Sequence, residues 1–276
     1  MMRPHVARHL LLTLGSCVFA VGALAQTPQT TAPFEPAVGQ PGKDVVWVPT
    51  SEELVAKMLD MARVTPQDYV IDLGSGDGRT VIAAARRGAR ALGIEYNPDM
   101  VELSKRNAAD QQLAGRATFT AGDLFEADLT PATVITMFLL PDINLRLRPT
   151  LLDLKPGTRV VSNTFTMDEW QPDETGTLSD EVCNTWCTAL LWIVPAKAAG
   201  TWRLGSSELT LTQEFQKVAG TLKTGSTSVP IAGRLRGDQI TFSADGTDYA
   251  GRVSGSTMQG RLTGTGGTWS ATRVAP

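Results

Sequence analysis

Two apolar runs that end in acidic residues constrain the fold of this chain more than any other feature. The first run ends around Asp72, and Gly74, Gly76 and Gly78 follow it at every second position. The second run ends at Glu95, about twenty residues further along the chain. This layout is typical of a nucleotide-like ligand lying over the carboxyl ends of parallel strands, where glycines let the backbone approach the ligand. Glu95 corresponds in position to the acid that binds the two ribose hydroxyls in such sites.

The spacing of the glycines separates two classes of cofactor. The dinucleotide fingerprint is G-x-G-x-x-G, whereas this chain has G-x-G-x-G around Ser75, with Asp72 two residues before the first glycine. This form resembles motif I of class I S-adenosylmethionine (SAM) methyltransferases. The resemblance implies that the cofactor is SAM, and it makes an NAD-binding oxidoreductase a distant alternative.

The segment from residue 44 to residue 195 alternates between apolar strands and amphipathic helices. Such alternation is typical of an α/β fold. The resemblance of the glycine motif implies a Rossmann-like class I methyltransferase sheet with helices on both faces. Expected strands cover residues 69–73, 91–95, 117–121, 133–139, 159–163 and 188–194, the last of them antiparallel to its neighbours. Expected helices cover residues 80–87, 98–112 and 143–154, and a capping box from Thr50 to Glu53 opens an earlier helix.

The segment from residue 196 to residue 276 has a different texture. It is rich in Gly, Thr and Ser and consists of short alternating runs without helical periodicity, which predicts a small antiparallel sheet or barrel. The tripeptide Gly-Thr-Trp occurs at residues 200–202 and again at residues 267–269, so we expect the first and last strands to pair. A stabilising or interaction role is expected for this domain in preference to a second active site.

Charge is distributed unevenly between these two segments. Residues 26–195 carry 14 Lys and Arg against 23 Asp and Glu, whereas residues 196–276 carry 9 against 5. This asymmetry supports two modules of different character. Because the basic residues are scattered and not clustered, no nucleic-acid partner is predicted.

Residues 1–25 have the pattern of a secretory signal peptide, with a basic start, a short apolar stretch and a small-residue cleavage site. The apolar stretch is short for a stable membrane span, which needs about 20 residues. We therefore expect an exported, periplasmic protein, with anchoring by an uncleaved leader or by a lipidated Cys17 as the alternative. Residues 26–43, rich in Gln, Thr, Pro and Gly, are predicted to form a flexible linker.

Both histidines, His5 and His9, lie in the predicted leader. Without the leader the chain has no imidazole, which excludes a Ser-His-Asp triad, a His-ligated metal centre and an imidazole general base. Methyl transfer from SAM fits this limit, and no metal site is predicted. Two cysteines remain, Cys183 and Cys187, which either close a small disulfide loop or stay as two half-buried thiols.

The segment from about residue 47 to residue 170 resembles the seven-strand protein-lysine methyltransferases of archaea and mitochondria. The resemblance rests on the glycine motif and on residues 48–50, 93–98, 138–141 and 151–162. It covers nearly half of the chain, and the C-terminal β segment lies outside it. The resemblance implies transfer of a methyl group from SAM to a nitrogen, with a protein lysine as the expected acceptor.

Three acids are expected to hold the cofactor. Asp72 would order the ammonium end of the methionine moiety, and Glu95 would accept hydrogen bonds from both ribose hydroxyls. Asp123 would accept the adenine amino group, with Leu124 against the ring. By resemblance, Thr50 belongs to a lid over SAM and the acceptor opening. The full set of expected cofactor contacts is Thr50, Asp72, Gly74, Ser75, Gly76, Gly78, Glu95, Tyr96, Asn97, Asp123 and Leu124.

The acceptor site is expected at the carboxyl end of the strand at residues 133–139. Asp142 and Asn144 follow this strand and are the candidates for orienting an amine; the alternative is that Asp142 caps the next helix. Tyr96 and the loop around Trp170 are candidates for walling the site by cation–π contact, with core packing as the alternative.

Two further functions stay open beside lysine methylation. A small-molecule or lipid methyltransferase would use the same cofactor site and take a small amine. A non-catalytic exported module with the same fold would bind a partner through its β domain.

Overall fold

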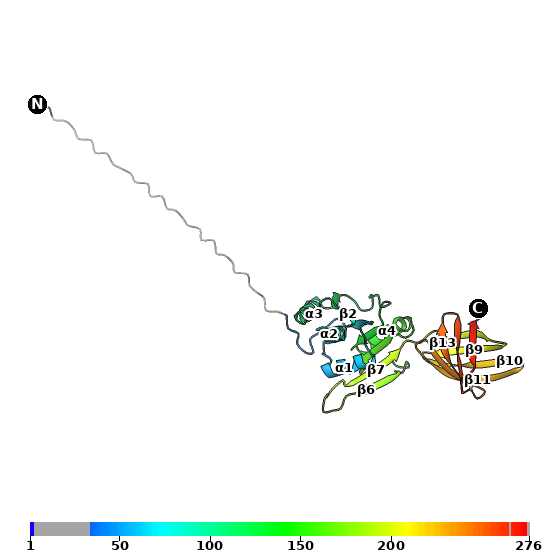
Figure 1. The fold of residues 1–276 in the computed structure, drawn as a ribbon. Helices are drawn as coiled ribbons and strands as arrows, with labels where there is room; N and C mark the ends of the chain where they lie inside the picture. The colour runs from blue at the N-terminus through cyan, green and yellow to red at the C-terminus, as the bar shows by residue number, and fades with distance from the viewer. Residues whose placement is uncertain (3–33, 265, 275–276) are drawn as a thin grey trace. The chain divides into compact units, whose positions relative to one another are not determined.

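The computed structural model contains a seven-stranded sheet in which β3, β2, β1, β4 and β5 are parallel neighbours. Figure 1 labels β2, β7 and β6 of this sheet. Across the sheet the strands are β3 (Ala117–Ala121), β2 (Arg90–Glu95), β1 (Tyr69–Leu73), β4 (Val134–Met137), β5 (Arg159–Asn163), β7 (Thr188–Ile193) and β6 (Glu174–Thr177). β7 is antiparallel to both β5 and β6. The predicted α/β fold with an antiparallel last strand is therefore confirmed.

The structure describes residues 1–2, 34–264 and 266–274. Residues Phe34–Pro276 form one unit, to which the following account applies. The predicted leader beyond its first two residues, including Cys17, and the first part of the predicted linker lie outside the described residues. No helix among the described residues is both long and apolar enough to span a bilayer.

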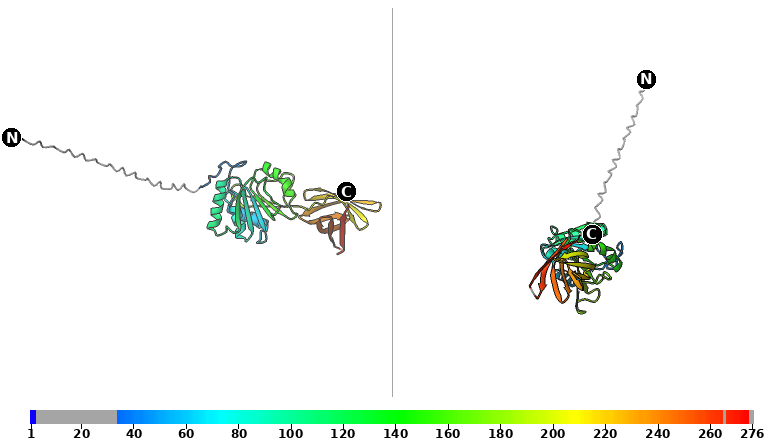
Figure 2. Two further views of the ribbon diagram at one scale, coloured as in Figure 1. Left: turned by 90° about the horizontal axis from the view of Figure 1, so that it is seen from above. Right: turned by 90° about the vertical axis from the view of Figure 1, so that its right-hand side faces the viewer.

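Helices cover both faces of the sheet (Figure 2). The helices are α1 (Glu52–Met61), α2 (Arg79–Arg86), α3 (Pro98–Asp110) and α4 (Pro141–Leu152). Successive strand residues face opposite sides, so Val70 packs in one core with α1, α2 and α3. Ile71 packs in the other core with Leu147 of α4 and with Trp170 and Trp192. Both faces of β1 are thus buried, which explains its continuous apolar run.

Three helix starts differ from the sequence predictions, and that of α2 differs by one residue only. The N-cap of α1 is Ser51, whose hydroxyl accepts the Leu54 N–H, so the predicted capping box starting at Thr50 is wrong by one residue. Helix α4 begins at Pro141, because proline lacks the N–H that would be unpaired in the first turn. Asp142 therefore lies inside the first turn and is not the N-cap.

The C-terminal residues form a closed antiparallel barrel. Around the barrel the strands are β10 (Lys217–Thr224), β11 (Thr227–Arg236), β12 (Gln239–Ala244), β13 (Thr247–Ser254), β14 (Thr257–Thr263), β15 (Thr268–Arg273), β8 (Gly200–Leu204) and β9 (Ser207–Glu214). The two Gly-Thr-Trp segments start β8 and β15, and these strands pair through Arg273 and Trp202, as predicted. Trp202 is fully buried in the barrel core.

Asp173, just before β6, links the barrel to the sheet. Its side chain is fully buried; one carboxylate oxygen accepts the Ile193 N–H at 2.8 Å, and the other pairs with Arg234 of β11 at 2.7 Å. Nearby, the buried Gln216 donates to the Gln171 carbonyl at 2.7 Å. The Asp173 carboxylate thus accepts hydrogen bonds both from a backbone N–H of the sheet domain and from a guanidinium of the barrel.

We expect Asp173→Ala to lower the free energy of unfolding by about 1–3 kcal/mol, because it removes the buried acceptor of the Ile193 N–H, whereas the Arg234 guanidinium is 48% exposed and regains water. Urea unfolding followed by tryptophan fluorescence measures this change. Asp153→Ala is the matched control, since Asp153 is 77% exposed and pairs only with the exposed Lys197; its expected cost is below about 0.5 kcal/mol. Equal costs for the two variants would contradict the structural role of Asp173.

Candidate functional site

The glycine loop between β1 and α2 has a conformation that requires its glycines. Gly74, Gly76 and Gly78 have φ of +73°, +54° and +83°, in the left-handed region. A Cβ on Gly76 would lie 2.6 Å from the indole nitrogen of Trp47. The loop therefore packs closely against Trp47, and Gly74 and Gly76 line the cavity at the carboxyl end of β1.

Asp72 supplies a buried carboxyl group at the carboxyl end of β1. It is 6% exposed, and it accepts a hydrogen bond from the Thr136 hydroxyl on the neighbouring strand β4 at 2.6 Å. Burial raises the pKa of Asp72 to about 7, and the nearby carboxylates of Glu95 and Asp77 add to the rise, while the Thr136 bond opposes it. The carboxyl group is thus placed to gain from a cation that a ligand would bring.

Glu95 has a fixed orientation at the end of β2. One carboxylate oxygen accepts the Gly76 N–H and the other accepts the Asn97 N–H, each at 2.9 Å. Each oxygen keeps a further acceptor site, and Glu95 lines the same cavity as Asp72. This carboxylate is therefore pre-oriented to accept two hydroxyl groups side by side.

Asp123 follows β3 and is engaged by a residue from the N-terminal segment. Its carboxylate pairs with Lys43 at 2.6 Å and accepts the Phe125 N–H at 2.9 Å. The hydrogen bond from Lys43 lowers the pKa of Asp123, and the same bond raises the pKa of Lys43. Lys43 also lies 4.8 Å from the ring centre of Tyr96. A cofactor contact through Asp123 would therefore form beside this ion pair.

Residues 39–47, which we call the strap, fold back on themselves over the site. Gly39 donates to the Trp47 carbonyl at 2.8 Å, Trp47 donates to the Gln40 carbonyl at 2.9 Å, and Pro41 bridges to Val46. Residues 40–43 were assigned from the sequence to a flexible linker, but they line the cavity. No periodic pattern of apolar residues marks this segment in the sequence.

Thr50 joins the strap to the glycine loop and to β5. Its hydroxyl accepts a hydrogen bond from the Asn163 side chain at 3.2 Å, and its carbonyl accepts one from Arg79 at 2.8 Å. Arg79 in turn pairs with Asp77 of the loop at 2.6 Å. Thr50 is buried and lines the cavity, which is compatible with its predicted place in a lid.

These groups surround one cavity of about 550 Å³, a volume typical of small-molecule sites. The cavity brings together nearly all of the predicted cofactor contacts: Thr50, Asp72, Gly74, Ser75, Gly76, Glu95, Tyr96, Asn97, Asp123 and Leu124. Gly78 does not line it; this residue is the N-cap of α2. The cavity also contains four aromatic residues that were not among the predicted contacts, Trp47, Phe138, Phe165 and Trp186.

Asp142 and Asn144, predicted to orient an acceptor amine, do not line the cavity. Asp142 is exposed on α4, whereas Asn144 is fully buried. The Asn144 amide donates to the carbonyls of Phe165 and Thr166 at 3.1 and 3.2 Å, so it holds the loop after β5. Trp170 is likewise fully buried in the core below α4, so the prediction that it walls the site is wrong.

The cavity fits SAM on physical grounds. A buried carboxyl with a raised pKa suits the cationic methionine end, and the fixed Glu95 carboxylate suits a diol. The hydroxyl oxygen of Ser75 is buried against Gly93 of β2, so Ser75 would meet a ligand through its backbone. The glycines below the cavity leave room for a ligand to approach the backbone.

Comparisons with known proteins agree with this fit. The ANTKMT methyltransferase domain family matches residues 72–174. Over 153 residues the chain is 41% identical to a protein-lysine N-methyltransferase of Saccharolobus islandicus (strain REY15A), covering 54% of this chain and 94% of that protein. It is 35% identical over 159 residues to a lysine N-methyltransferase of Rattus norvegicus that is named for ATP synthase, covering 56% and 71%.

A solved structure gives the same result for the fold. The crystal structure of an RNA methyltransferase from Salinibacter ruber, in complex with S-adenosyl-L-homocysteine, superposes with a TM-score of 0.51 and 47% sequence identity. The match covers 54% of this chain and 95% of that one. The barrel formed by β8 to β15 is an addition to this shared core.

The parallel sheet, the glycine loop and the acids at the strand ends define a class I SAM-dependent methyltransferase. SAM is its cofactor, as the matched enzymes and the S-adenosyl-L-homocysteine bound in the related structure indicate. Within this class, the chain belongs to the protein-lysine N-methyltransferase family of the archaeal and mitochondrial type.

The pKa of Asp72 gives a pH dependence whose sign can be worked out. Below about pH 7 the carboxyl group is mainly neutral, and above it the group is ionised. A bound cation favours the ionised form, so we expect the affinity for SAM to rise about tenfold between about pH 6 and pH 8. In the cofactor-free protein the same burial penalises ionisation, so stability falls as the pH rises from 3.8 towards about 7.

Isothermal titration of SAM at several pH values measures this effect, with Asp72→Asn as the reference. The variant shares any titration of SAM itself but has no carboxyl group at this position. A wild-type profile that runs parallel to the Asp72→Asn profile would show that Asp72 does not contact the cation.

Proposed function

We propose that this protein transfers the methyl group of SAM to the ε-amino group of lysine in a protein substrate. The proposal rests mainly on the similarity to a protein-lysine N-methyltransferase that aligns over 94% of its length. The aromatic residues at the second half of the cavity support it, because they suit an alkyl chain that ends in a cation.

The side chains of the cavity would act by binding and alignment. SAM, when bound, supplies a methyl group already activated on a sulfonium. Asp72, Glu95 and Asp123 would hold the cofactor, and the strap would exclude water from above. The described residues include no histidine, so no imidazole among them removes the proton of the acceptor amine. Alignment of the amine with the methyl group would supply most of the rate acceleration.

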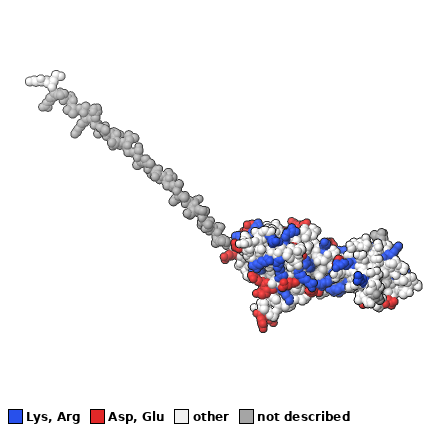
Figure 3. Space-filling model, viewed as in Figure 1, with Lys and Arg blue, Asp and Glu red and all other residues white. Residues whose placement is uncertain are grey.

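The charge of the methyltransferase segment favours a protein acceptor over RNA. The related protein from Salinibacter ruber is described as an RNA methyltransferase. Here, residues 26–195 carry 23 acidic side chains against 14 basic ones. In Figure 3, basic side chains lie beside acidic ones on the face shown. An acidic, mixed surface repels a phosphate backbone.

We also propose that the protein works outside the cytoplasm, as the predicted signal peptide implies. A disulfide between Cys183 and Cys187 supports this location, because such bonds persist in oxidising compartments.

A labelling experiment tests the acceptor class. The full chain is incubated with methyl-tritiated SAM and, in separate reactions, with cell-envelope proteins, total RNA, lipid extract and small polyamines. The proposal predicts label in protein, recovered as methyllysine after acid hydrolysis. Label confined to RNA, lipid or polyamines would overturn it in favour of that acceptor.

A further inference from the structure

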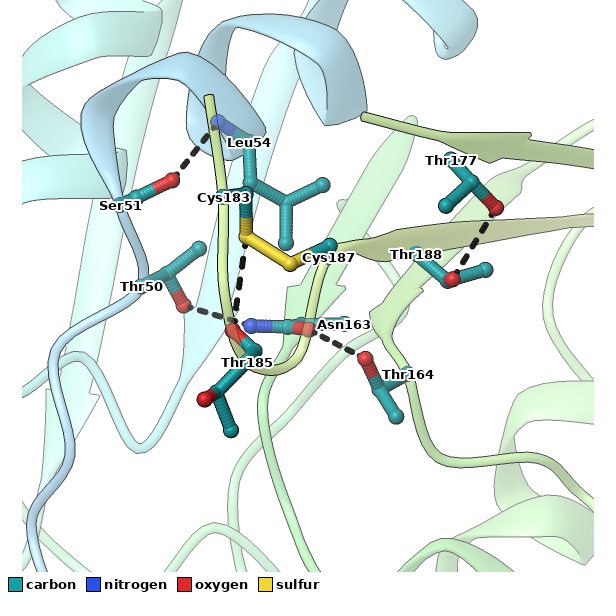
Figure 4. The surroundings of a disulfide bond; sticks show 10 residues. All are labelled: Thr50, Ser51, Leu54, Asn163, Thr164, Thr177, Cys183, Thr185, Cys187 and Thr188. Carbon is teal, nitrogen blue, oxygen red and sulfur yellow. Dashed lines mark hydrogen bonds between the residues drawn. A yellow bond between two sulfur atoms is a disulfide. The ribbon is translucent and has the colours of Figure 1, made fainter. Parts of the chain in front are cut away.

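A short disulfide-closed loop lies next to the cavity. Cys183 and Cys187 are bonded, which settles the alternative left open by the sequence. Figure 4 shows this disulfide beside Thr50 and Asn163, which belong to the site already described. The loop enters β7, and its carbonyl at Cys187 accepts the Leu178 N–H at 2.9 Å. The disulfide closes the loop, and this hydrogen bond holds the end of the loop next to β6.

Within this loop Trp186 is held in an unusual position. Its φ is +55°, which is uncommon for a residue with a bulky side chain. Its side chain lines the cavity and packs edge-on against Phe138 at 5.8 Å between ring centres, yet the residue remains 40% exposed. An exposed indole fixed in this way at a cavity mouth is available to a ligand.

Two further aromatic rings continue the wall that Trp186 begins. Phe138 stacks on Phe165 at 5.9 Å, and both line the cavity. Phe165 is fixed through its backbone: its carbonyl accepts hydrogen bonds from Ser162 at 2.8 Å and from Asn144 at 3.1 Å. We call Phe138, Phe165 and Trp186 the aromatic wall. Of its three members, only Trp186 depends on the disulfide for its position.

The strand order places this wall opposite the cofactor groups. Along the carboxyl edge of the sheet, β3, β2 and β1 present Asp123, Glu95 and Asp72, and β4 and β5 then lead into Phe138 and Phe165. The side of the cavity next to β4 and β5 is therefore aromatic, whereas the side next to β1, β2 and β3 carries the carboxylates together with Trp47 and Tyr96. The two halves meet between Asp72 and Phe138, because β1 and β4 are neighbours.

The carboxylates suit the cofactor, and the aromatic rings suit the acceptor. Rings attract an ammonium through their negative faces and also pack against its alkyl chain. They need no N–H donor from the cation, so they bind a methylated ammonium as well as an unmethylated one. The aromatic wall therefore suits an aminoalkyl chain at each stage of methylation.

We propose that Trp186, positioned by the Cys183–Cys187 disulfide, determines acceptor specificity by binding the cationic aminoalkyl chain. This inference rests on the proposed function, because it assigns the acceptor half of the same cavity. It adds a consequence that the cofactor site does not share: reduction of the disulfide weakens acceptor binding and leaves SAM binding intact.

Two small probes test the recognition of the cation. Nα-acetyl-lysine methylamide carries the ammonium, and Nα-acetyl-norleucine methylamide has a similar chain without charge. Their binding to the full chain is measured by NMR titration with S-adenosylhomocysteine at saturation. We expect the wild type to favour the lysine probe about tenfold, and Trp186→Ala to lose most of this preference, while Trp186→Phe keeps it in part.

The disulfide is tested in the same assay. Cys183→Ser with Cys187→Ser, and the wild type treated with dithiothreitol, should both bind the lysine probe several-fold more weakly. Dithiothreitol should have no effect on the double variant. Val182→Ala is the matched control, because Val182 is exposed just outside the loop and does not line the cavity; it should behave as the wild type.

The outcomes separate this inference from the proposed function. Unchanged SAM affinity in every variant, measured by calorimetry, shows that each variant is folded. If Trp186→Ala or the reduced protein binds the lysine probe as the wild type does, the inference is overturned while lysine methylation stands. If the wild type binds SAM but does not distinguish the lysine probe from norleucine, the lysine acceptor and the aromatic wall fail together.

Discussion

Replacing Glu95 with alanine is expected to weaken SAM binding by at least about 100-fold. The carboxylate would accept two hydroxyl groups, and each charge-assisted hydrogen bond contributes about 1.5–3 kcal/mol when both partners are withdrawn from water. The change also releases the N–H groups of Gly76 and Asn97, which Glu95 holds at 2.9 Å, so the glycine loop loses a fixed point. Calorimetric titration of SAM measures the loss.

Two other variants make this result specific. Glu95→Gln keeps the shape and one acceptor oxygen, so we expect an intermediate loss. Glu102→Ala removes an exposed acid that pairs only with Lys105 on α3, so SAM affinity should not change. Retention of near wild-type affinity by Glu95→Ala would show that the ligand lies elsewhere in the cavity.

Replacing Gly78 with alanine is expected to lower the free energy of unfolding by about 3 kcal/mol. Its φ of +83° costs an alanine about 1 kcal/mol or more. The added Cβ would also lie 2.7 Å from the ring of Phe119 and 2.9 Å from the Cβ of Ser104, and such overpacking costs about 1–3 kcal/mol. Urea unfolding measures the sum.

Gly246→Ala separates these two contributions. Gly246 has a similar φ of +73°, but no atom lies within 4 Å of the position of its Cβ. Its expected cost is about 1 kcal/mol, from backbone conformation alone. If the two variants lose the same stability, then close packing between α2, β3 and α3 is not what requires glycine at position 78.

The parts of the fold that were predictable from the sequence are those set by local patterns. The expected strands at residues 69–73, 117–121 and 159–163 coincide with β1, β3 and β5, because each is a short segment centred on β-branched or aromatic residues. Strand β4 ends at Met137, two residues earlier than expected. Phe138 and Leu139 leave the sheet to line the cavity, although their apolar side chains continue the strand pattern.

The edge strand β6 could not be predicted, because its sequence lacks the apolar residues that mark a strand. Its four residues, Glu174–Thr177, alternate between half-buried and exposed positions and include no large apolar side chain. Pairing with β7, and not the composition of the segment, makes it a strand. The barrel was easier to predict, because repeated alternation and turn residues mark most of its hairpins; the turn between β9 and β10, at Phe215 and Gln216, is an exception.

In the candidate site, the cofactor half was predictable and the acceptor half was not. Asp72 and Glu95 lie at the ends of strands, and their distances in sequence from the glycines match a known motif. Lys43 meets Asp123 across 80 residues of sequence, from a segment whose composition is typical of a linker. Phe138, Phe165 and Trp186 come from three separate loops, and in the sequence each is typical of a residue in the hydrophobic core. Only the packing of β4, β5 and the disulfide loop brings them together.

The measurement that tests the central claim most directly is mass spectrometry of the reaction product. The full chain and its Glu95→Ala variant are incubated with trideuteromethyl SAM and cell-envelope proteins, and tryptic peptides are searched for the heavy methyl group. We predict trideuteromethyl groups on lysine in the wild-type reaction and none above background in the variant reaction. Heavy methyl groups on another residue type, or none at all from a protein that binds SAM, would contradict the account.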